Sequence, residues 1–570
     1  MRANWVVAFV AIVGCNFGSS AAPAVDNSCS GDASCEEGAC DGAICIDDSS
    51  ASVEVAIEVL RGASDLLSAT PSSWAFAPES VSGSSTRNLD LPPTREVRGT
   101  VRWDGSRVPA MLRFVRRMAE PVASLTPEAV EVDTLREVAG GDAPDGYDFS
   151  VFLVAGASYD VTVLPSSDVV TSSVEPAAPA VRSLPPLYLP LFIDGGDIGE
   201  PLRFDIAFAA NLSDGCVDAF ELGCTLEAEV FSVDGGVERA EAGLQVRAVD
   251  KQTQRVVSSI GETDENGHFA IRIGVSSADY WIRVTSSPGH VPFPSVSVDP
   301  ALAFVNDPLE KRIYIPRLNL VRFTGRVRDS NDVPIPGATV RFFSTGIFGG
   351  SQLGLEGSFS DSASTDAEGR FAADLLPGFY TISVTPPSDV ENAWGILSAG
   401  ALVGEEITAT EALIVPPRIG LRGWVATFRD ESAAGVTILA RARSGTAWNA
   451  RSQESVSNSI GAFGMSLDEG LYDLHVKVSS DSGFAWLVEP DLMMSAEVGD
   501  TVRGYQLTPP IPIRGILRSS DGQTVPSALI RAYVLVDTGD GATRPLQVAE
   551  TTSGEDGSYR LLIAPHFGGE

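Results

Sequence analysis

The side chains that most often carry catalysis or bind metals are few in this chain. Its four histidines are His268, His290, His475 and His566, and none has a glutamate three residues later, as a His-x-x-Glu metal pair would require. His475 alternates with apolar neighbours, which predicts a solvated residue on the outward face of a strand. No HExxH, GxSxG or GxGxxG motif is present. The histidines therefore indicate no enzyme.

One triplet, Asp537-Thr538-Gly539, resembles the Asp-Thr-Gly of aspartic proteases. It is followed by Asp540-Gly541 rather than by Ser or Thr, and the stretch is typical of a hairpin loop. No second carboxylate motif is present to share a proton with Asp537. We therefore predict no catalytic residue, no metal site and no cofactor.

Four of the seven cysteines fall within a short acidic segment without any basic residue: Cys29, Cys35, Cys40 and Cys45. In an exported chain they predict two disulfides, in any of three connectivities. Zinc binding is the alternative, but the spacing lacks paired C-x2-C knuckles. Calcium binding by the neighbouring carboxylates is another, although no EF-hand-type loop is present. Cys216 and Cys224 predict a third disulfide that closes a small loop.

The N-terminal residues resemble an export signal. A basic Met1-Arg2 start precedes an apolar run from Trp5 to Val13, which is too short to span a bilayer. The end of this run, residues 12–15, resembles a bacterial lipobox, with Ile12 where Leu is usual. It predicts lipidation of Cys15, an outer-membrane anchor, a signal peptide over 1–14 and a tether over 15–50. The alternative is an ordinary secretory signal cleaved near residue 22.

The charge balance excludes two classes of partner. The chain has 570 residues, 40 Lys plus Arg and 75 Asp plus Glu, and a formal net charge of −35. Nucleic acid and anionic lipid surfaces are bound through clustered positive charge, so this balance argues against both. Any membrane contact is therefore predicted to run through the N-terminal lipid.

One segment pattern recurs five times and decides the fold class. An alternating strand around an Arg-Gly pair is followed by a second strand, a D-x-x-G-x-[FY] turn and a strand that ends in Tyr-x-[IL]-x-Val. The third copy shows it best, with its turn at 366–371 and its last strand at 380–384. Equivalent first-strand positions are residues 99, 228, 325, 423 and 515, and three of the four intervals are close to the length of a seven-strand sandwich.

These copies predict an all-β chain with five sandwiches, over 96–182, 223–317, 318–416, 417–510 and 511–570. Residues 183–222 are expected to be an inserted linker, and 51–95 a divergent partial module that contains a strand from Val53 to Val59. The fifth copy lacks the closing strand, so either the sequence is truncated or something else completes it. Proline-rich joints between copies are stiff, which predicts an extended string of beads.

The copies resemble carboxypeptidase regulatory-like domains, the transthyretin-like (prealbumin-like) β-sandwich modules found in tandem on bacterial surface proteins. The residues that carry this resemblance are Gly325-Arg326-Val327, Pro336-Gly337-Ala338, Asp366 to Phe371 and Gly378-Phe379-Tyr380, with their counterparts in the other copies. The resemblance implies an exported, cell-surface protein that is either periplasmic or surface-exposed. Similar sandwiches are grouped with carbohydrate-binding folds, which implies sugar binding by analogy only.

Two functions from different classes follow. The first is a non-enzymatic lipoprotein whose sandwiches form a stalk or scaffold for a surface protein. The second is a carbohydrate-binding array for a polysaccharide, with Trp394, Trp448 and Trp486 as candidate contacts because they fall in loops or strand ends. Trp103, Trp281 and Trp424 lie within strands, where core packing explains them at least as well. A third, weaker hypothesis is an accessory region of a peptidase.

Overall fold

The computed structural model describes the chain in segments: 39–41, 44–46, 52–60, 73–103, 105–117, 129–134, 147–165, 184–195, 200–208, 224–234, 236–274, 279–286, 295–300, 311–316, 319–347, 356–388, 394–404, 407–444, 450–538 and 542–567. The predicted signal peptide, Cys15, Cys29, Cys35, Cys216 and Trp448 lie outside these residues.

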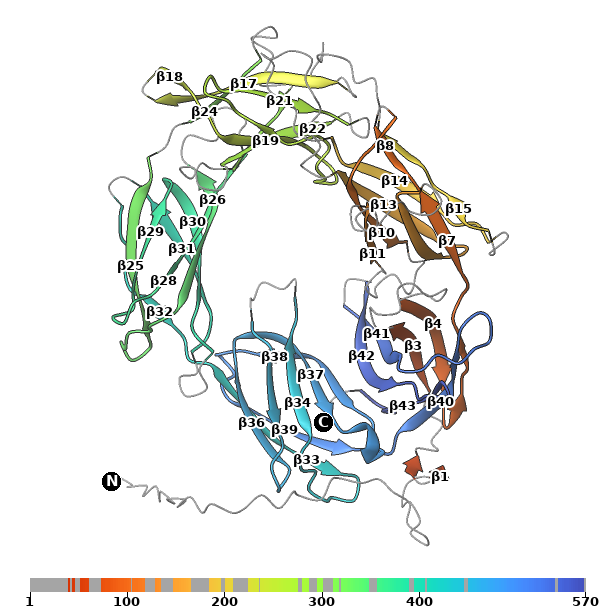
Figure 1. Ribbon diagram of the computed structural model, residues 1–570. Helices are drawn as coiled ribbons and strands as arrows, with labels where there is room; N and C mark the ends of the chain where they lie inside the picture. The colour runs from red at the N-terminus through yellow and green to blue at the C-terminus, as the bar shows by residue number, and fades with distance from the viewer. Residues whose placement is uncertain are drawn as a thin grey trace, which may run out of the picture.

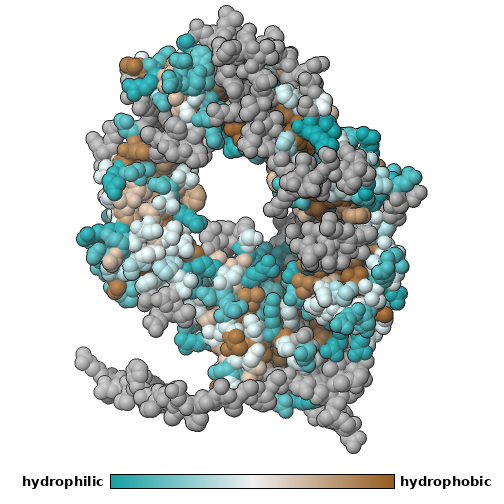
Figure 2. Space-filling model, in the orientation of Figure 1, coloured by the Kyte–Doolittle hydropathy of each residue, from teal (hydrophilic) through white to brown (hydrophobic). Residues whose placement is uncertain are grey.

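The chain is all-β, as predicted, and its strands form five sandwiches that are arranged in a ring (Figure 1). An opening passes through the ring and persists when side chains are drawn as spheres (Figure 2). The prediction of an extended string of beads is therefore wrong. The sandwiches are not free of one another, because described residues of neighbouring modules are in contact, for example Arg451 with the Pro386 and Trp394 carbonyls.

Module 3 (321–415) shows the basic sandwich. Its strands alternate between buried apolar and exposed residues, because one face of each strand packs in the core and the other faces water. One sheet has the order β29-β25-β32 and the other β28-β26-β30-β31, and β25 and β32 run parallel. The strands are β25 Val321–Asp329, β26 Thr339–Ile347, β28 Ser360–Ser364, β29 Arg370–Leu375, β30 Gly378–Thr385, β31 Leu397–Val403 and β32 Leu413–Val415.

Module 4 (419–507) repeats this topology with sheets β36-β33-β39 and β35-β34-β37-β38. A 3-10 helix, η4 Ser480–Ser482, precedes β38. The strands are β33 Ile419–Thr427, β34 Thr437–Ala442, β35 Gln453–Val456, β36 Ala462–Leu467, β37 Gly470–Lys477, β38 Leu487–Met494 and β39 Thr501–Leu507.

Module 2 (225–316) has the same arrangement, with one strand added from its neighbour. β27 Glu356–Ser358, which precedes β28 of module 3 in the chain, pairs with β23 and extends the sheet β20-β19-β22-β23. The strands are β17 Thr225–Asp234, β18 Val237–Ala240, β19 Leu244–Asp250, β20 Gly261–Glu262, β21 His268–Arg272, β22 Tyr280–Ser286, β23 Ser295–Val298 and β24 Arg312–Pro316.

Module 1 (94–208) is longer than predicted, because part of the expected linker belongs to it. β14 pairs with β13, and β15 and β16 run parallel to β7 and β8, so residues 187–208 supply the strands that close this sandwich. The strands are β7 Thr94–Gly99, β8 Val101–Trp103, β9 Ser106–Arg107, β10 Ala110–Arg116, β11 Ala129–Asp133, β12 Phe149–Val154, β13 Ser158–Pro165, β14 Leu187–Phe192, β15 Leu202–Arg203 and β16 Ile206–Phe208.

Module 5 is assembled from both ends of the described chain. The C-terminal strands β40 Ile511–Arg518, β41 Leu529–Asp537, β42 Thr543–Thr552 and β43 Ser558–Ile563 are only part of a sandwich. The segment predicted as a divergent module supplies the rest: β3 Val53–Leu60, β4 Ser73–Val81, β5 Ser85–Thr86 and β6 Leu89–Asp90. The resulting sheets, β4-β3-β41-β42 and β43-β40-β5 with β6 beside β40, match those of module 3.

Ahead of these strands, β1 Ala39–Asp41 and β2 Ile44–Ile46 form a two-stranded hairpin. Its register places Cys40 opposite Cys45. In modules 1, 2 and 3 the sheet that contains β10, β19 or β26 faces the opening, and the other sheet faces outward (Figure 1). Each module has its own core of buried apolar residues.

Candidate functional site

The closure of the ring is the most distinctive feature of the structure. β3 runs antiparallel between β4 and β41, with Ile57 opposite Ala532 and Val59 opposite Ile530. Val55, Ile57 and Val59 occupy the positions that Tyr380, Ile382 and Val384 occupy in β30. The missing closing strand is therefore present at the other end of the sequence, with valine in place of tyrosine, and the strand predicted from Val53 to Val59 is confirmed.

The second sheet of module 5 is closed by the residues that follow β4. The Arg87 amide donates to the Arg514 carbonyl at 2.7 Å, and the Leu91 amide to the Arg518 carbonyl at 2.8 Å. The Tyr559 hydroxyl donates to the Arg87 carbonyl at 2.6 Å. A Cβ on Gly515 would lie 1.9 Å from that carbonyl oxygen, so only glycine fits here.

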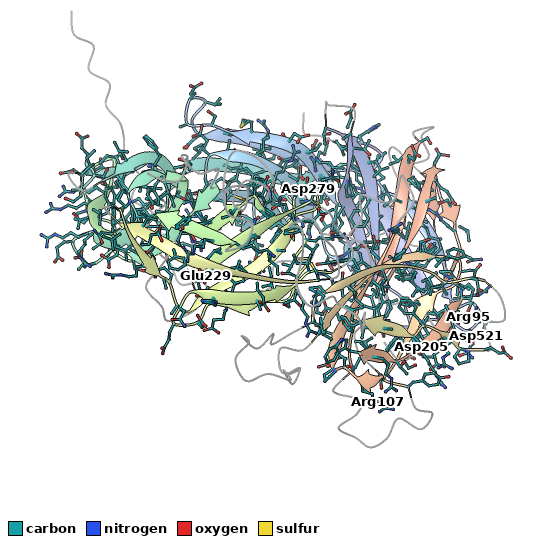
Figure 3. The ribbon with its side chains drawn as sticks, turned by 90° about the horizontal axis from the view of Figure 1, so that it is seen from above. Arg95, Arg107, Asp205, Glu229, Asp279 and Asp521 are labelled. Carbon is teal, nitrogen blue, oxygen red and sulfur yellow. The ribbon has the colours of Figure 1, made fainter. Side chains whose placement is uncertain are left out.

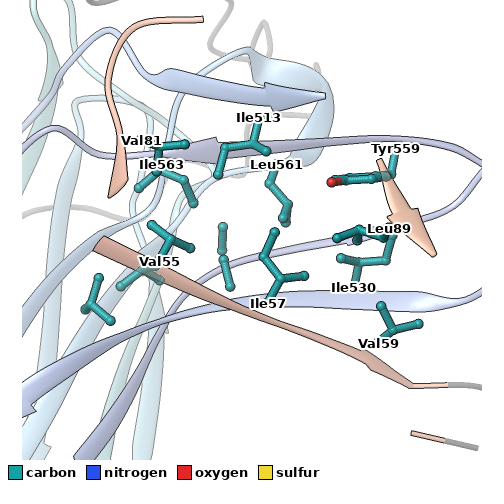
Figure 4. Close-up of a cluster of buried hydrophobic side chains, with 14 of the residues drawn as sticks. Val55, Ile57, Val59, Val81, Leu89, Ile513, Ile530, Tyr559, Leu561 and Ile563 are labelled. Atoms are coloured by element: carbon teal, nitrogen blue, oxygen red, sulfur yellow. The ribbon is translucent and has the colours of Figure 1, made fainter. Parts of the chain in front are cut away.

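The two chain segments share one hydrophobic core (Figure 4). Val55, Ile57 and Leu89 from the N-terminal segment are fully buried against Ile513 and Ile530 from the C-terminal strands. Burying side chains of this size stabilises a fold by roughly 1.5–3 kcal/mol each. The closure is therefore a complete sandwich core and not a surface contact.

A charged cluster joins modules 4 and 5. Arg544 of β42 donates to both carboxylate oxygens of Asp473 in β37, at 2.7 Å each, and to Asp491 at 3.2 Å. Asp473 is only 7% exposed, so this bidentate pair is shielded from solvent. The pair fixes how module 5 sits on module 4.

His475 lies on the same face of β37 and is only 3% exposed, so the prediction of a solvated histidine is wrong. The pattern placed it correctly on the outward face of its strand, but module 5 covers that face. Burial, with the charge of Lys477, lowers the pKa of His475 to about 4, while the charge of Asp473 opposes this. His475 is therefore neutral near pH 7.

A second buried charge cluster lies where module 4 meets module 3. The Asp468 carboxylate pairs with Arg418 at 3.1 Å and with Arg451 at 2.9 Å. Burial alone would raise the pKa of Asp468, but the hydrogen bonds from Arg451 and the two positive charges hold it below its usual value. Arg451 also donates to the backbone carbonyls of Pro386 and Trp394, at 2.8 and 2.7 Å, and so ties the two modules together.

Cation–π contacts mark the two joints of module 1. Arg116 of β10 stacks over Trp74 of β4, 4.6 Å from the ring centroid, and this joins module 1 to the split module 5. On the other side Arg255 of module 2 lies 5.0 Å from the Tyr188 ring centroid, and the Tyr188 hydroxyl donates to the Val256 carbonyl at 3.1 Å. Module 1 thus contacts both of its neighbours through described residues.

A hollow of about 630 Å³ opens at the joint between modules 2 and 3, next to the β23–β27 pairing. Phe343, which is 49% exposed, lines it. Its other lining groups are mostly hydroxyls and carboxylates: Thr285, Ser286, Ser295, Ser344, Ser360, Asp361 and Asp374, with Leu320 and Phe359. An exposed aromatic ring among hydroxyl and carboxylate groups is an arrangement that can hold a small polar ligand.

A second hollow, of about 610 Å³, lies on the outer sheet of module 3 and contains three arginines: Arg322, Arg326 and Arg370. The first of these pairs with Asp374 at 3.4 Å. Because Asp374 also lines the first hollow, the two hollows meet at this ion pair. Sequence patterns predict a binding site at neither place.

The tryptophans that the sequence suggested as sugar contacts do not share one site. Trp394 is half-buried against the core of module 3, and its backbone forms an isolated antiparallel β-bridge with Pro417. Trp486 is half-buried against the core of module 4, with the Lys477 ammonium 4.3 Å from its ring centroid. Both therefore serve packing at or near module joints. Trp448 lies outside the described residues, and sugar binding at all three stays a prediction.

The strand tryptophans divide between packing and exposure. Trp103 packs partly buried against the core of module 1, as expected. Trp424 is 53% exposed, so core packing does not explain it. Its ring lies on the outward face of β33 and covers Gly504 of the neighbouring strand β39, where a Cβ would be only 2.6 Å from the indole.

The predicted turn and hairpin are both confirmed. Asp366 Oδ1 accepts from the amides of Glu368 and Arg370, at 3.0 and 2.8 Å, and Gly369 has a φ of 71°. Asp264 makes the same bonds in module 2. Asp537 and Thr543 pair at the base of the β41–β42 hairpin, where the sequence suggested one.

Cys224 is buried and disulfide-bonded, while its predicted partner Cys216 lies outside the described residues. Within the described segments, no group of three or more His, Cys, Asp or Glu residues is placed to hold a metal ion. The same segments include no helix with the length and apolarity of a membrane span.

No protein-family model and no curated protein matches this chain. Among solved structures, a streptococcal ancillary pilin is 11% identical, with 57% of this chain and 99% of that chain covered and a TM-score of 0.19. The Bacillus anthracis TIE protein is 8% identical over 73% of this chain and 74% of that chain, with a TM-score of 0.17. The minor pilin GBS52 of Streptococcus agalactiae is 13% identical over 33% of this chain and 96% of that chain, with a TM-score of 0.20. Scores this low support no argument about function.

Proposed function

We propose that this chain is a non-enzymatic lipoprotein of the bacterial cell surface, anchored to the outer membrane through Cys15. Its sandwiches, which resemble carboxypeptidase regulatory-like modules, act as a closed scaffold that presents surface-exposed sites at fixed positions. This replaces the stalk of the sequence prediction, because a ring has a limited reach and a defined shape.

The closure of module 5 carries this proposal. A flexible stalk needs no contact between its first and last modules, whereas here the two ends of the described chain form one core. The ion pairs of Arg544 and Arg451 at the neighbouring joints add directional contacts. Such joints suit a protein whose role is to hold partners in a constant geometry.

Cell fractionation of the full chain and of Cys15→Ser, expressed in a diderm bacterium, tests the location. The unaltered chain should label with an alkyne fatty acid, sediment with outer membranes and bind antibody on intact cells. Cys15→Ser should lose the label and become soluble after export. A chain that stays in the cytoplasm, or carries no lipid, would contradict the proposal.

Carbohydrate binding is the second candidate, and the hollow at Phe343 favours it. Exposed aromatic rings beside hydroxyl and carboxylate groups can stack on and hydrogen-bond to sugars. A glycan array with the full chain and with Phe343→Ala, Trp394→Ala, Trp448→Ala and Trp486→Ala tests this. Binding lost only in Phe343→Ala would place the site at the joint of modules 2 and 3. Binding lost in a tryptophan variant would instead place the sugar site at the position predicted from the sequence. No binding to any glycan would exclude carbohydrate binding as the function.

A further inference from the structure

The outer sheet of module 3 carries a shallow trough whose ends are positively charged. Its floor consists of small residues of β25, β29 and the segment before β32: Thr324, Gly325, Ala372, Ala409, Thr410 and Ala412. Arg322 stands at one end of β25, and Arg326 stands four residues further along the same face, about 13 Å away at a strand rise of ~3.4 Å per residue. Arg370 of β29 is directly opposite Arg326.

The pairing of Arg326 with Arg370 is unfavourable by itself. Like charges directly opposite each other in neighbouring antiparallel strands destabilise a sheet. Neither guanidinium makes an ion pair with any residue in the described part of the chain. Asp366 lines the same hollow, but one of its carboxylate oxygens already caps the adjacent turn. Arg322 is paired with Asp374, yet both side chains are more than half exposed, so that pair is weak.

Module 2 shows that the fold does not require this arrangement. In β17 and β21 the equivalent positions are Glu229 and His268, whose Oε1 and Nε2 atoms lie 2.9 Å apart. Arg312 of β24 pairs with the same glutamate at 2.9 Å. Glu229 lies on the outer sheet of its module (Figure 3). At this position of the sandwich, the charges of module 2 are thus paired within the module, whereas module 3 has two positive charges side by side.

We propose that this trough, lined by Arg322, Arg326 and Arg370, binds an acidic oligosaccharide through its carboxylate or sulfate groups. Arginine suits both anions, because its planar fork can donate two parallel hydrogen bonds to one of them. The anion would relieve the repulsion between Arg326 and Arg370, and a second anion about 13 Å further along would reach Arg322.

Two observations favour a sugar over an acidic peptide. β25, which forms the floor, is already paired with β29 on one side and with Ala409 and β32 on the other, so a peptide could not add to it as a further strand. The floor also presents the hydroxyls of Thr324 and Thr410, which can hydrogen-bond to sugar hydroxyls. The net charge of −35 does not prevent binding of a short anion, because charges beyond roughly 8 Å are screened at physiological salt.

Binding at this trough does not depend on the proposed scaffold function, and it shares with the proposed carbohydrate binding only the class of ligand. Its test measures binding of oligogalacturonides to the full chain by calorimetry, beside their methyl esters and a sulfated oligosaccharide of similar length. The acidic forms should bind and the methyl esters should not, and the affinity should fall as salt rises. If no acidic oligosaccharide binds at low salt, the inference is wrong, while a neutral sugar bound through Phe343 would still be detected on the array.

Arg326→Glu and Arg370→Glu are the informative variants, because each creates the opposite-charge pair that module 2 has. We expect each to weaken binding by about tenfold or more while the melting temperature stays the same or rises. Arg341→Glu, an exposed residue on the other sheet of module 3, makes the same charge change away from the trough and should bind normally. Equal losses of affinity in all three variants would show that the change in net charge, and not the trough, accounts for the weaker binding, and this would overturn the proposal. Equal affinity for a poly-glutamate peptide would overturn the choice of a sugar.

Discussion

Modules 3 and 5 have the same two sheets in the same strand order, but they are made in different ways. In module 3 the chain passes from β29 to β30 through Leu376 and Pro377. In module 5 the equivalent step leaves β43 at Ile563 and resumes at Val53, at the other end of the described chain. The comparison shows that a sandwich of this kind requires the strands and their core contacts, while the connection between them is dispensable.

The difference has an energetic consequence. The strands of module 3 need only local turns to meet, whereas those of module 5 meet only after the intervening modules have taken their places. Closing a longer loop costs more conformational entropy. We therefore expect the closure strands to form last and to open first, although their buried contacts are equivalent to those of module 3.

The largest expected effect comes from a matched pair of core truncations. Ile57→Ala and Ile382→Ala remove fully buried side chains at equivalent positions and should each cost about 2–5 kcal/mol of unfolding free energy. Only Ile57→Ala should open the ring, so the radius of gyration from small-angle X-ray scattering should increase for that variant alone. If the two variants scatter alike, the closure is no weaker than an ordinary module.

Acidification should weaken the joint on which module 5 rests. The pKa of His475 is about 4 in the folded chain, below its usual value near 6.5, so the unfolded chain binds the proton first as the pH falls. His475 therefore costs no stability above pH 6.5. Between pH 6.5 and 4 it lowers the free energy of unfolding, by up to ~3 kcal/mol. Lys477, Arg441 and Arg544 favour the neutral form, and Asp473 opposes it.

Thermal unfolding from pH 7.5 to 4.5 measures this loss. His475→Gln has no titrating group at that position and should show a smaller fall in melting temperature than the unaltered chain. The same slope in both would mean that carboxylates alone account for the acid sensitivity.

Gly515 of module 5 and Gly325 of module 3 occupy equivalent positions but lie against different groups. A Cβ at Gly515 would meet the Arg87 backbone carbonyl at 1.9 Å, whereas one at Gly325 would meet the side chains of Phe371 and Thr410 at 2.4 and 2.7 Å. Both alanine variants should be destabilised by about 1–3 kcal/mol. Gly515→Ala should also release the residue 85–90 segment to proteolysis, and Gly325→Ala should not. Protection of that segment in Gly515→Ala would argue against its placement beside β40.

The smallest effect is expected from a single hydroxyl. Tyr533 of β41 donates to the Glu58 carboxylate of β3 at 2.7 Å, across the closure, while Tyr380 donates to the Leu376 carbonyl within its own module at 2.8 Å. Removing either hydroxyl should cost about 1 kcal/mol in urea unfolding. Tyr533→Phe should in addition speed hydrogen exchange in β3. Unchanged exchange there would show that this bond does not hold the closure.

The repeating features were predictable because their causes are local. The D-x-x-G turns and the alternating strands depend on residues within one segment, and the structure confirms them at Asp366 and in β25. The closing strand of module 5 does not follow from the repeat pattern, because Val55 stands where tyrosine is expected and because its partners lie at the far end of the sequence. No local pattern states which distant strand a segment will join.

The errors about exposure have a related cause. Alternation assigned His475 correctly to the outward face of a strand, but it could not show that another module covers this face. Prolines that stiffen a joint predict an extended arrangement, but they do not reveal contacts between neighbouring modules such as those of Arg451 with the Pro386 and Trp394 carbonyls. For the same reason the two hollows could not be predicted, since each combines side chains from separate strands.

The position of β3 determines how the molecule would carry mechanical load. A pull applied at residue 52 acts along β3, which has hydrogen-bonded neighbours on both sides, β4 and β41. Antiparallel hydrogen bonds lie across the strand axis, so a pull along β3 loads many of them together in shear. If they failed, the ring would open into a linear string that stays attached through module 1. The closure would therefore resist a steady pull, and its failure would lengthen the chain while modules 1 to 4 stay folded.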